Sequence, residues 1–307
     1  MKKIISLVLV LAFVFIGVIA CNKSTEETTE ETAEKSYTLA LAVDTTTGTK
    51  VSNTVVALVL DAENKIVAAR IDSVEAAPKL DDTGALVKQT SVATKVEQGD
   101  AYGNGYKMDA GSWANQAKAF ENWLVGKTAA DVAGAEITKE LVAGCTMESS
   151  MATFKTLVAE AFATDNKVEF KTADAVTVGL ALDTAVKSSR SGGATVSTDV
   201  AVVAIAGGKV VATAIDSIEQ SFSIEDDALV AGTLTLSKAE RGDAYKMDAG
   251  SWINQAKAFA ASTVGKTVAE LNDLEPVSDA LAAAGCTMQS TTAGYKATII
   301  KAAASAR

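Results

Sequence analysis

An internal duplication constrains the fold of this chain more than any other feature. The stretch "GDAYGNGYKMDAGSWANQAKAF", which begins at Gly99, recurs from Gly242 as "GDAYKMDAGSWINQAKAF", and "AGCTM" occurs near the end of each copy. "LALAVDT", "KIVAARIDSVE" and "VGKTAADV" also have counterparts in the same order. Matches of this kind at a nearly constant offset indicate a duplicated domain. We therefore divide the body of the chain into a first repeat, residues 37–164, and a second repeat, residues 165–307.

Each repeat begins with strand patterns and continues with helical ones. "TVVALVLDAENKIVAARID" and "DVAVVAIAGGKVVATAID" are rich in β-branched residues and are interrupted by a short turn, which predicts a β-hairpin in each copy. Apolar residues then recur at helical spacing behind Ser112 and Ser251, which we expect to be N-caps. These residues are Trp113, Ala117, Phe120 and Leu124 in the first copy, and Trp252, Ala256 and Phe259 in the second.

A further helix is predicted after each "AGCTM", through "SSMATFKTLVAEAFA" and "TTAGYKATIIKAAASA". Strands followed by helices, without regular alternation of the two, are typical of an α+β fold. We expect two tandem repeats of a small antiparallel sheet, each covered by helices on one face.

The N-terminus has the pattern of an export signal. Residues 1–20, "MKKIISLVLVLAFVFIGVIA", combine two lysines with an apolar run, and "VIAC" fits the lipobox of bacterial lipoproteins. We predict a lipoprotein signal peptide and acylation of Cys21; a cleaved secretory peptide with an unmodified cysteine is the alternative. Residues 21–36 are acidic, rich in threonine and without large apolar side chains, which predicts a disordered tether. The protein is expected on the extracytoplasmic face of the cell membrane.

Composition excludes several classes of function. The chain has no histidine, so Ser-His-Asp hydrolysis and histidine-ligated metals are excluded. Its three cysteines are too few for a four-thiolate zinc or iron–sulfur site, and we expect no metal. A net charge of −10 argues against a nucleic-acid partner and against electrostatic binding to anionic lipid. Attachment to the membrane would therefore depend on the lipid anchor alone.

The threonines of the two "AGCTM" copies, Thr146 and Thr287, are candidate site residues. Each directly precedes a predicted helix, where free backbone amides and the helix dipole favour a bound phosphate. The alternative is that each threonine is only the N-cap of that helix.

The neighbouring cysteines, Cys145 and Cys286, admit three interpretations. A helix N-terminus can lower a thiol pKa enough for nucleophilic or redox chemistry, although no histidine is present to pair with it. A disulfide between the repeats would require the two Cα atoms to lie within about 7 Å. The third interpretation is a small buried residue beside a glycine.

Four further residues belong to the repeated motifs. Lys107 and Lys246 could neutralise a phosphate or be solvated, and Trp113 and Trp252 could anchor a helix or stack on a cofactor. The aspartates that follow the lysines, Asp109 and Asp248, could cap the next helix.

Together, "KIVAARIDSVE", "VGKT" and "AGCT" followed by a helix ending "VAEAF" resemble the FMN-binding domain family. That family includes flavin-carrying subunits of the sodium-pumping NADH:quinone reductase and lipoproteins of Gram-positive extracellular electron transfer. The resemblance covers both repeats. It implies that a flavin transferase joins FMN through its phosphate to Thr146 and Thr287, and that Gly144 and Gly285 let the backbone approach the phosphate. This chain differs from the family motif in having cysteine at 145 and 286 where the family has alanine.

The resemblance implies a lipid-anchored electron carrier with two FMN groups, rather than an enzyme with a substrate of its own. The electron donor would be a membrane quinone or dehydrogenase, and the acceptor would lie outside the cell. The alternative is a non-redox surface lipoprotein that binds a small solute or acts structurally. The predicted cofactor-binding residues are Lys107, Trp113, Gly144, Cys145 and Thr146, with Lys246, Trp252, Gly285, Cys286 and Thr287 in the second repeat.

Overall fold

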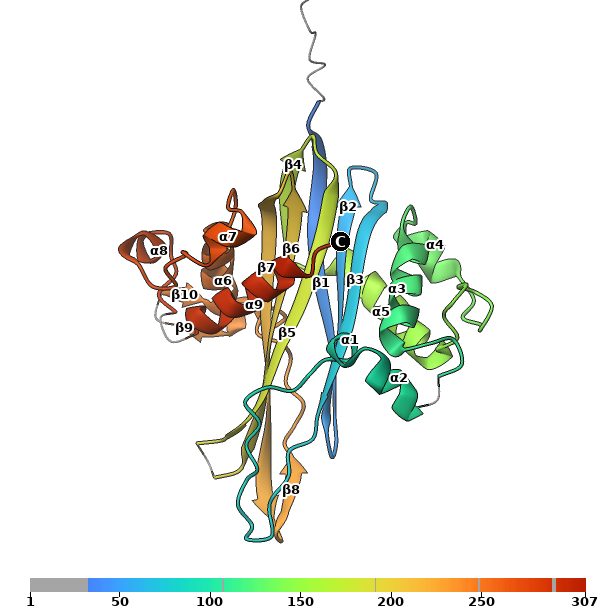
Figure 1. Cartoon of the computed structure of the whole chain (residues 1–307). Helices are drawn as coiled ribbons and strands as arrows, with labels where there is room; N and C mark the ends of the chain where they lie inside the picture. Colours follow the sequence, from blue (N-terminus) through green and yellow to red (C-terminus); the bar gives the residue numbers. More distant parts are fainter. Residues whose placement is uncertain (1–32, 107, 191, 248, 289–290) are drawn as a thin grey trace, which may run out of the picture. The chain divides into compact units, whose positions relative to one another are not determined.

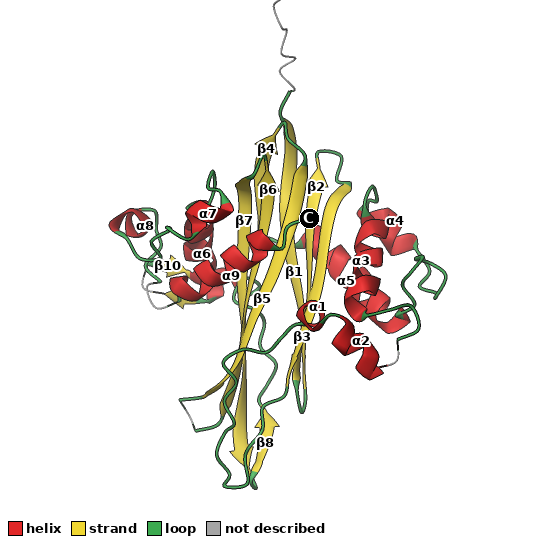
Figure 2. Ribbon diagram, viewed as in Figure 1, coloured by secondary structure: helices red, strands yellow, loops and turns green. Residues whose placement is uncertain are grey.

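The computed structural model describes residues 33–106, 108–190, 192–247, 249–288 and 291–307. The predicted signal peptide, Cys21 and most of the predicted tether lie outside the described residues. The fold is α+β, as predicted, with two four-stranded antiparallel sheets that each carry helices (Figures 1 and 2). No helix within the described ranges is long and apolar enough to cross a membrane.

The first sheet has the strand order β3-β2-β1-β4. Its strands are β1 (Lys35–Thr47), β2 (Val51–Asp61), β3 (Ile66–Ala76) and β4 (Lys167–Thr172). The predicted hairpin corresponds to β2 and β3, and its turn is closed by the Asp61 carboxylate, which accepts hydrogen bonds from two backbone N–H groups. Although β4 lies beyond the end of the first sequence repeat, it pairs with β1 from Lys35 to Ala40.

The second sheet has the order β5-β6-β7-β8. Its strands are β5 (Val176–Ser188), β6 (Ala194–Ala206), β7 (Lys209–Glu225) and β8 (Ala228–Ala231). The predicted second hairpin is formed by β6 and β7. Both residues of its turn, Gly207 and Gly208, have positive φ angles of 54° and 73°, which glycine adopts without strain.

The helices follow the strands in each repeat. The first repeat contains α1 (Lys95–Gln98), α2 (Asp100–Tyr106), α3 (Trp113–Leu124), α4 (Ala129–Gly134) and α5 (Glu148–Ala163). The second contains the 3-10 turn η1 (Gly242–Ala244), the short strands β9 (Lys246–Met247) and β10 (Gly250–Ser251), and the helices α6 (Trp252–Ala261), α7 (Val268–Leu271), α8 (Asp279–Ala283) and α9 (Thr292–Ala304). Helices α3, α5, α6 and α9 correspond to the four helices that the sequence predicts.

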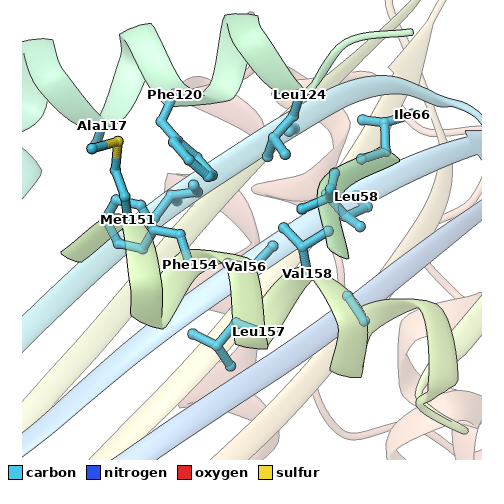
Figure 3. Close-up of a cluster of buried hydrophobic side chains, with 14 of the residues drawn as sticks. Val56, Leu58, Ile66, Ala117, Phe120, Leu124, Met151, Phe154, Leu157 and Val158 are labelled. Carbon is cyan, nitrogen blue, oxygen red and sulfur yellow. The ribbon is translucent and has the colours of Figure 1, made fainter. Parts of the chain in front are cut away.

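One face of the first sheet packs against α3 and α5. Figure 3 shows Phe120 and Leu124 of α3 and Phe154 of α5 meeting side chains from the strands, including Leu58. These side chains are almost completely buried. The apolar side chains on one face of the helices and those on one face of the sheet therefore form a single core.

The opposite faces of the two sheets pack on each other. On β1, Ala40 and Ala42 belong to the helix-facing core, whereas Leu39 and Leu41 belong to a core shared with strands of the second sheet. Leu180 and other apolar residues of β5 and β6 complete this shared core. The layers are thus helix, sheet, sheet and helix, and the two repeats bury apolar surface jointly.

A buried polar chain crosses this interface between the sheets. Asn53 Nδ2 donates to Thr198 Oγ1 at 2.8 Å, and Thr198 is also hydrogen-bonded to Thr184 at 2.8 Å. On the other side, Thr45 Oγ1 donates to Asn53 Oδ1 at 2.8 Å. Because buried polar groups need partners, these bonds favour one register between the sheets.

Candidate functional site

The "AGCTM" loops form a turn that depends on glycine. Gly144 and Gly285 have φ angles of 82° and 94°, in the left-handed region that other residues rarely adopt. Cys145 N–H donates to the Val142 carbonyl at 3.0 Å, and Cys286 N–H donates to the Leu281 carbonyl at 2.9 Å. Both loops therefore need glycine at this position, because their turn requires a positive φ angle.

Each candidate threonine is bound by a glutamine from the preceding long helix. Thr146 N–H and Oγ1 both donate to Gln116 Oε1, at 2.8 and 3.3 Å. In the second repeat, Thr287 N–H and Oγ1 donate to Gln255 Oε1 at 2.8 and 3.0 Å. The glutamines are 1% and 0% exposed. Two loops in separate repeats thus hold their threonines by the same pair of hydrogen bonds.

The side-chain nitrogens of the two glutamines differ in their hydrogen bonding. Gln116 Nε2 donates to the Gly111 carbonyl at 3.0 Å, which connects the threonine loop to the "KMDAGSW" loop. Within the described part of the second repeat, Gln255 Nε2 and Ser251 Oγ are buried and have no hydrogen-bond partner.

The threonines are not helix N-caps, so that alternative is wrong. The N-cap of α5 is Met147 and the N-cap of α9 is Thr291, and neither makes a side-chain capping bond. Thr146 and Thr287 direct their hydroxyls to glutamine instead. No capping hydrogen bond from the side chain at the N-cap of α5 is present in the described part of the chain, which makes this helix start a favourable place for an anion.

A cavity of about 400 Å³ lies beside Thr146. It is lined by Lys95, Tyr102, Met108, Trp113 and residues 146–150. A neighbouring pocket of about 200 Å³ shares Lys95 and Trp113 with it. The neighbour adds hydroxyl groups from the sheet and from α5, those of Thr46, Ser52, Thr54, Ser73 and Thr153. Cavities of this size and mixed character are typical of small-molecule sites.

Among the described residues that line this cavity, Lys95 is the one cation, and the sequence analysis missed it. Its Nζ lies 2.8 Å from Glu75 Oε1, 5.1 Å from the ring centre of Tyr102 and 5.6 Å from that of Trp113. Burial raises the pKa of Glu75, but hydrogen bonds from Lys50 and Lys95 outweigh it and hold that pKa below its ordinary value. In the second repeat, Lys238 Nζ lies 3.1 Å from Glu219 Oε1 and 5.7 Å from the ring centre of Tyr245.

Twin buried aspartates fix the segments that carry these lysines. Asp72 Oδ1 accepts hydrogen bonds from Ser73 N–H at 2.7 Å and Val96 N–H at 3.1 Å. Asp216 Oδ1 accepts from Ser217 N–H at 2.7 Å and Ala239 N–H at 2.9 Å. Burial raises the pKa of each carboxyl to about 6. The repeated "IDS" motif was the sequence signal for them.

The predicted tryptophans are core residues. Trp113 is 3% exposed and packs edge-on against Phe154, with ring centres 5.9 Å apart. Trp252 packs in the same way against Tyr295 and donates from Nε1 to its hydroxyl at 3.3 Å. Both indoles therefore anchor a helix, and Trp113 also forms part of the cavity wall.

Both cysteines are buried and free, which excludes the disulfide. Burial raises the pKa of Cys145, so its thiolate is disfavoured at neutral pH. The interpretation as small buried residues is the one that the geometry supports, and Cys145 and Cys286 belong to the helix-facing cores.

The remaining candidates lie at the surface or outside the described residues. Lys246 is exposed on β9, and Asp109 is exposed in the loop before α3. Ser112 caps α3, accepting from Asn115 N–H at 3.3 Å, so Asp109 does not cap that helix. Lys107 and Asp248 lie outside the described residues. Ser251 is the N-cap of α6 as predicted, but without a side-chain hydrogen bond.

No group of three or more potential metal ligands occurs among the residues described here. Comparisons of the chain with protein-family models, curated proteins and solved structures found no match. The resemblance to the FMN-binding domain family therefore stays a prediction.

Proposed function

We propose that this chain is an electron carrier that holds FMN by phosphoester bonds at Thr146 and Thr287. The observation that carries the proposal is the twin threonine–glutamine geometry. In both repeats the loop presents one threonine hydroxyl, held by a buried glutamine, just before a long helix. Thr146 also borders a cavity of about 400 Å³, which leaves room for a cofactor beside its hydroxyl.

The residues around Thr146 fit a flavin nucleotide. The phosphate would lie near the threonine and the uncapped start of α5, where backbone N–H groups favour an anion. Tyr102, Met108 and Trp113 give the cavity an apolar wall, and its lining also holds two charged side chains, Lys95, which is paired with Glu75, and Glu148. FMN would supply reversible electron transfer, and the protein would orient it and limit its contact with water.

The cellular setting of this proposal rests on the sequence. Acylation of Cys21 would hold the protein at the extracytoplasmic face of the membrane. A membrane quinone or dehydrogenase would then donate electrons, and an acceptor outside the cell would take them. A flavin transferase is the partner that attaches the cofactor.

The proposal is tested by intact mass and visible absorbance after coexpression with a flavin transferase and magnesium. We expect two FMN adducts in the wild type, one in Thr146→Ala, one in Thr287→Ala and none in the double variant. Thr156→Ala is the matched control, because Thr156 is exposed on α5 and its described hydrogen bond is to the Ala152 carbonyl of the same helix. It should carry two adducts.

Each other outcome has a definite meaning. A colourless wild type without added mass would refute the proposal and favour the non-redox surface lipoprotein. Yellow protein that loses its FMN on denaturation would refute the covalent bond while keeping the flavin site.

A further inference from the structure

We propose that Gln116 and Gln255 are the positioning residues for the two threonines, holding each hydroxyl in place for phosphoester formation. This inference rests on the proposed function. Both glutamines lie on the buried side of the helix that follows the "KMDAGSW" motif, one turn after the core tryptophan. A buried glutamine needs polar partners, and the threonine provides them.

The hydrogen bonds define what the glutamine does. One carbonyl oxygen, Gln116 Oε1, accepts both the backbone N–H and the hydroxyl of Thr146. This arrangement fixes the loop through the N–H and turns the hydroxyl proton inward, which leaves the lone pairs of Oγ1 available to attack. An amide is not a base, so Gln116 positions the nucleophile and does not take its proton.

The bond changes in the attachment step show why two hydrogen bonds matter. Threonine Oγ1 forms a bond to the phosphorus of a flavin dinucleotide, the bond to the nucleotide leaving group breaks with its electron pair, and the hydroxyl proton is released. The product oxygen has no hydrogen to donate. The backbone N–H bond to the glutamine stays, so the loop keeps its position after modification.

The two glutamines differ in a way that sharpens the test. Gln116 Nε2 is bonded to the Gly111 carbonyl, whereas the described residues offer no acceptor to Gln255 Nε2. A glutamate at either position keeps the acceptor for the threonine. When ionised, a glutamate at 116 would also place an oxygen against the Gly111 carbonyl, while at 255 it would lose no described hydrogen bond; the comparison is therefore made at alkaline pH, where the carboxyl is ionised. Glutamate should therefore substitute better at 255 than at 116.

The experiment measures the rate of FMN attachment to each threonine separately, by peptide mass spectrometry of the full chain incubated with flavin transferase and flavin dinucleotide. Methionine has a similar length to glutamine but offers no comparable acceptor. We expect Gln116→Met to slow attachment at Thr146 by roughly tenfold, the effect of losing a hydrogen bond, and to leave Thr287 unchanged. Gln255→Met should do the reverse. Gln255→Glu should restore most of the rate at Thr287, and Gln116→Glu should restore less at Thr146.

A second readout does not involve flavin. Hydrogen exchange at the Thr146 amide should become faster in Gln116→Met, because that N–H loses its acceptor, and exchange at Thr287 should not change. Unaltered attachment rates in the methionine variants, with a modified wild type, would overturn the positioning role and leave the proposed function intact. Equal slowing at both threonines would also overturn it, since that points to general loss of structure. A wild type modified at neither threonine would remove the proposed function and this inference together.

Discussion

The two repeats share their threonine loops but differ in the structure beside them. In both, a buried glutamine holds the threonine, a buried aspartate holds the start of the lysine segment, and that lysine pairs with a glutamate of the sheet. The first repeat adds "GNGY", which contributes to α2, whereas the corresponding part of the second forms the 3-10 turn η1, followed by the short strands β9 and β10. The shared features are the ones that position a hydroxyl and a cation. The secondary structure next to these features differs between the two repeats.

A second difference lies in the buried charges. Arg70 and Glu121 are each 4% exposed, and Arg70 Nε lies 4.0 Å from Glu121 Oε1. Their counterparts in the second repeat are Ala214 and Ala260. Glu121 also accepts from Ile71 N–H at 2.8 Å and from Arg307 at 2.9 Å, so one carboxylate links the first sheet, α3 and the C-terminus. The first repeat thus contains a buried charged network, in which Arg70 Nε and Nη1 make no hydrogen bond to the described residues, where the second repeat has small apolar residues.

The largest expected effect comes from breaking this network. Glu121→Ala removes the only negative charge bonded to Arg307 in the described chain and leaves Arg70 buried without its nearest counter-charge. We expect the free energy of unfolding to fall by about 3–5 kcal/mol, measured by urea denaturation. The double variant Arg70→Ala with Glu121→Ala copies the second repeat and should recover part of that loss. A double variant less stable than Glu121→Ala alone would contradict the pairing.

The twin aspartates give the next largest effect, and here the repeats should agree. The carboxyls of Asp72 and Asp216 have a pKa near 6 when folded, against an ordinary value of 3.8. Between about pH 4 and 6 the folded protein keeps these protons and the unfolded chain has lost them. Stability therefore falls as pH rises through this window, by about 2–3 kcal/mol for each aspartate.

Asp72→Asn and Asp216→Asn should each remove the part of the stability loss between pH 4 and 6 that comes from the replaced aspartate. The measurement is the unfolding free energy at a series of pH values, taken as the difference between variant and wild type so that other carboxyls cancel. Equal flattening by both variants would confirm that the two sites are equivalent. If the wild type became more stable between pH 4 and 6 relative to either variant, the burial argument would be wrong.

The hairpins and the long helices were predictable because their signals are local. Strand-like runs rich in β-branched residues, interrupted by "DAEN" or "AGG", predict a hairpin. Trp113, Phe120 and Leu124 predict an apolar helix face, whatever that face packs against. The packing of sheet on sheet was not predicted, although "TVVALVLD" is apolar at successive positions, as expected of a strand buried on both faces. The pairing of β4 with β1 is non-local and has no signal in "KVEFKT".

At the site, the sequence predicted the loops but not their partners. Thr146 and Thr287 were found because "AGCTM" is repeated, yet their hydrogen bonds to Gln116 and Gln255 connect residues about thirty positions apart. Both glutamines lie inside the repeated stretch, in "SWANQAKAF" and "SWINQAKAF". A polar residue retained within an apolar stripe was the signal that could have identified them. Lys95 and Lys238 lie just before the matched "GDAY" stretches, in "TKVEQGD" and "SKAERGD", so extending the repeat by four residues toward the N-terminus would have identified them.

The smallest expected effect tests whether the two lysines are equivalent. Lys95 pairs with Glu75, whose side chain is 24% exposed, and lies near two aromatic rings. Lys238 pairs with Glu219, whose side chain is 50% exposed, so water screens that pair more effectively. Lys95→Met should therefore lower the free energy of unfolding by about 1 kcal/mol, and Lys238→Met by about half as much or less. Each methionine keeps the apolar stem of the lysine, which confines the change to the charge.

Because Lys95 lies 5.6 Å from the Trp113 ring centre, Lys95→Met should also change tryptophan fluorescence, whereas Lys238→Met, whose ring contact is with Tyr245, should not. A larger stability loss in Lys238→Met would mean that exposure of the partner glutamate does not set the strength of these pairs.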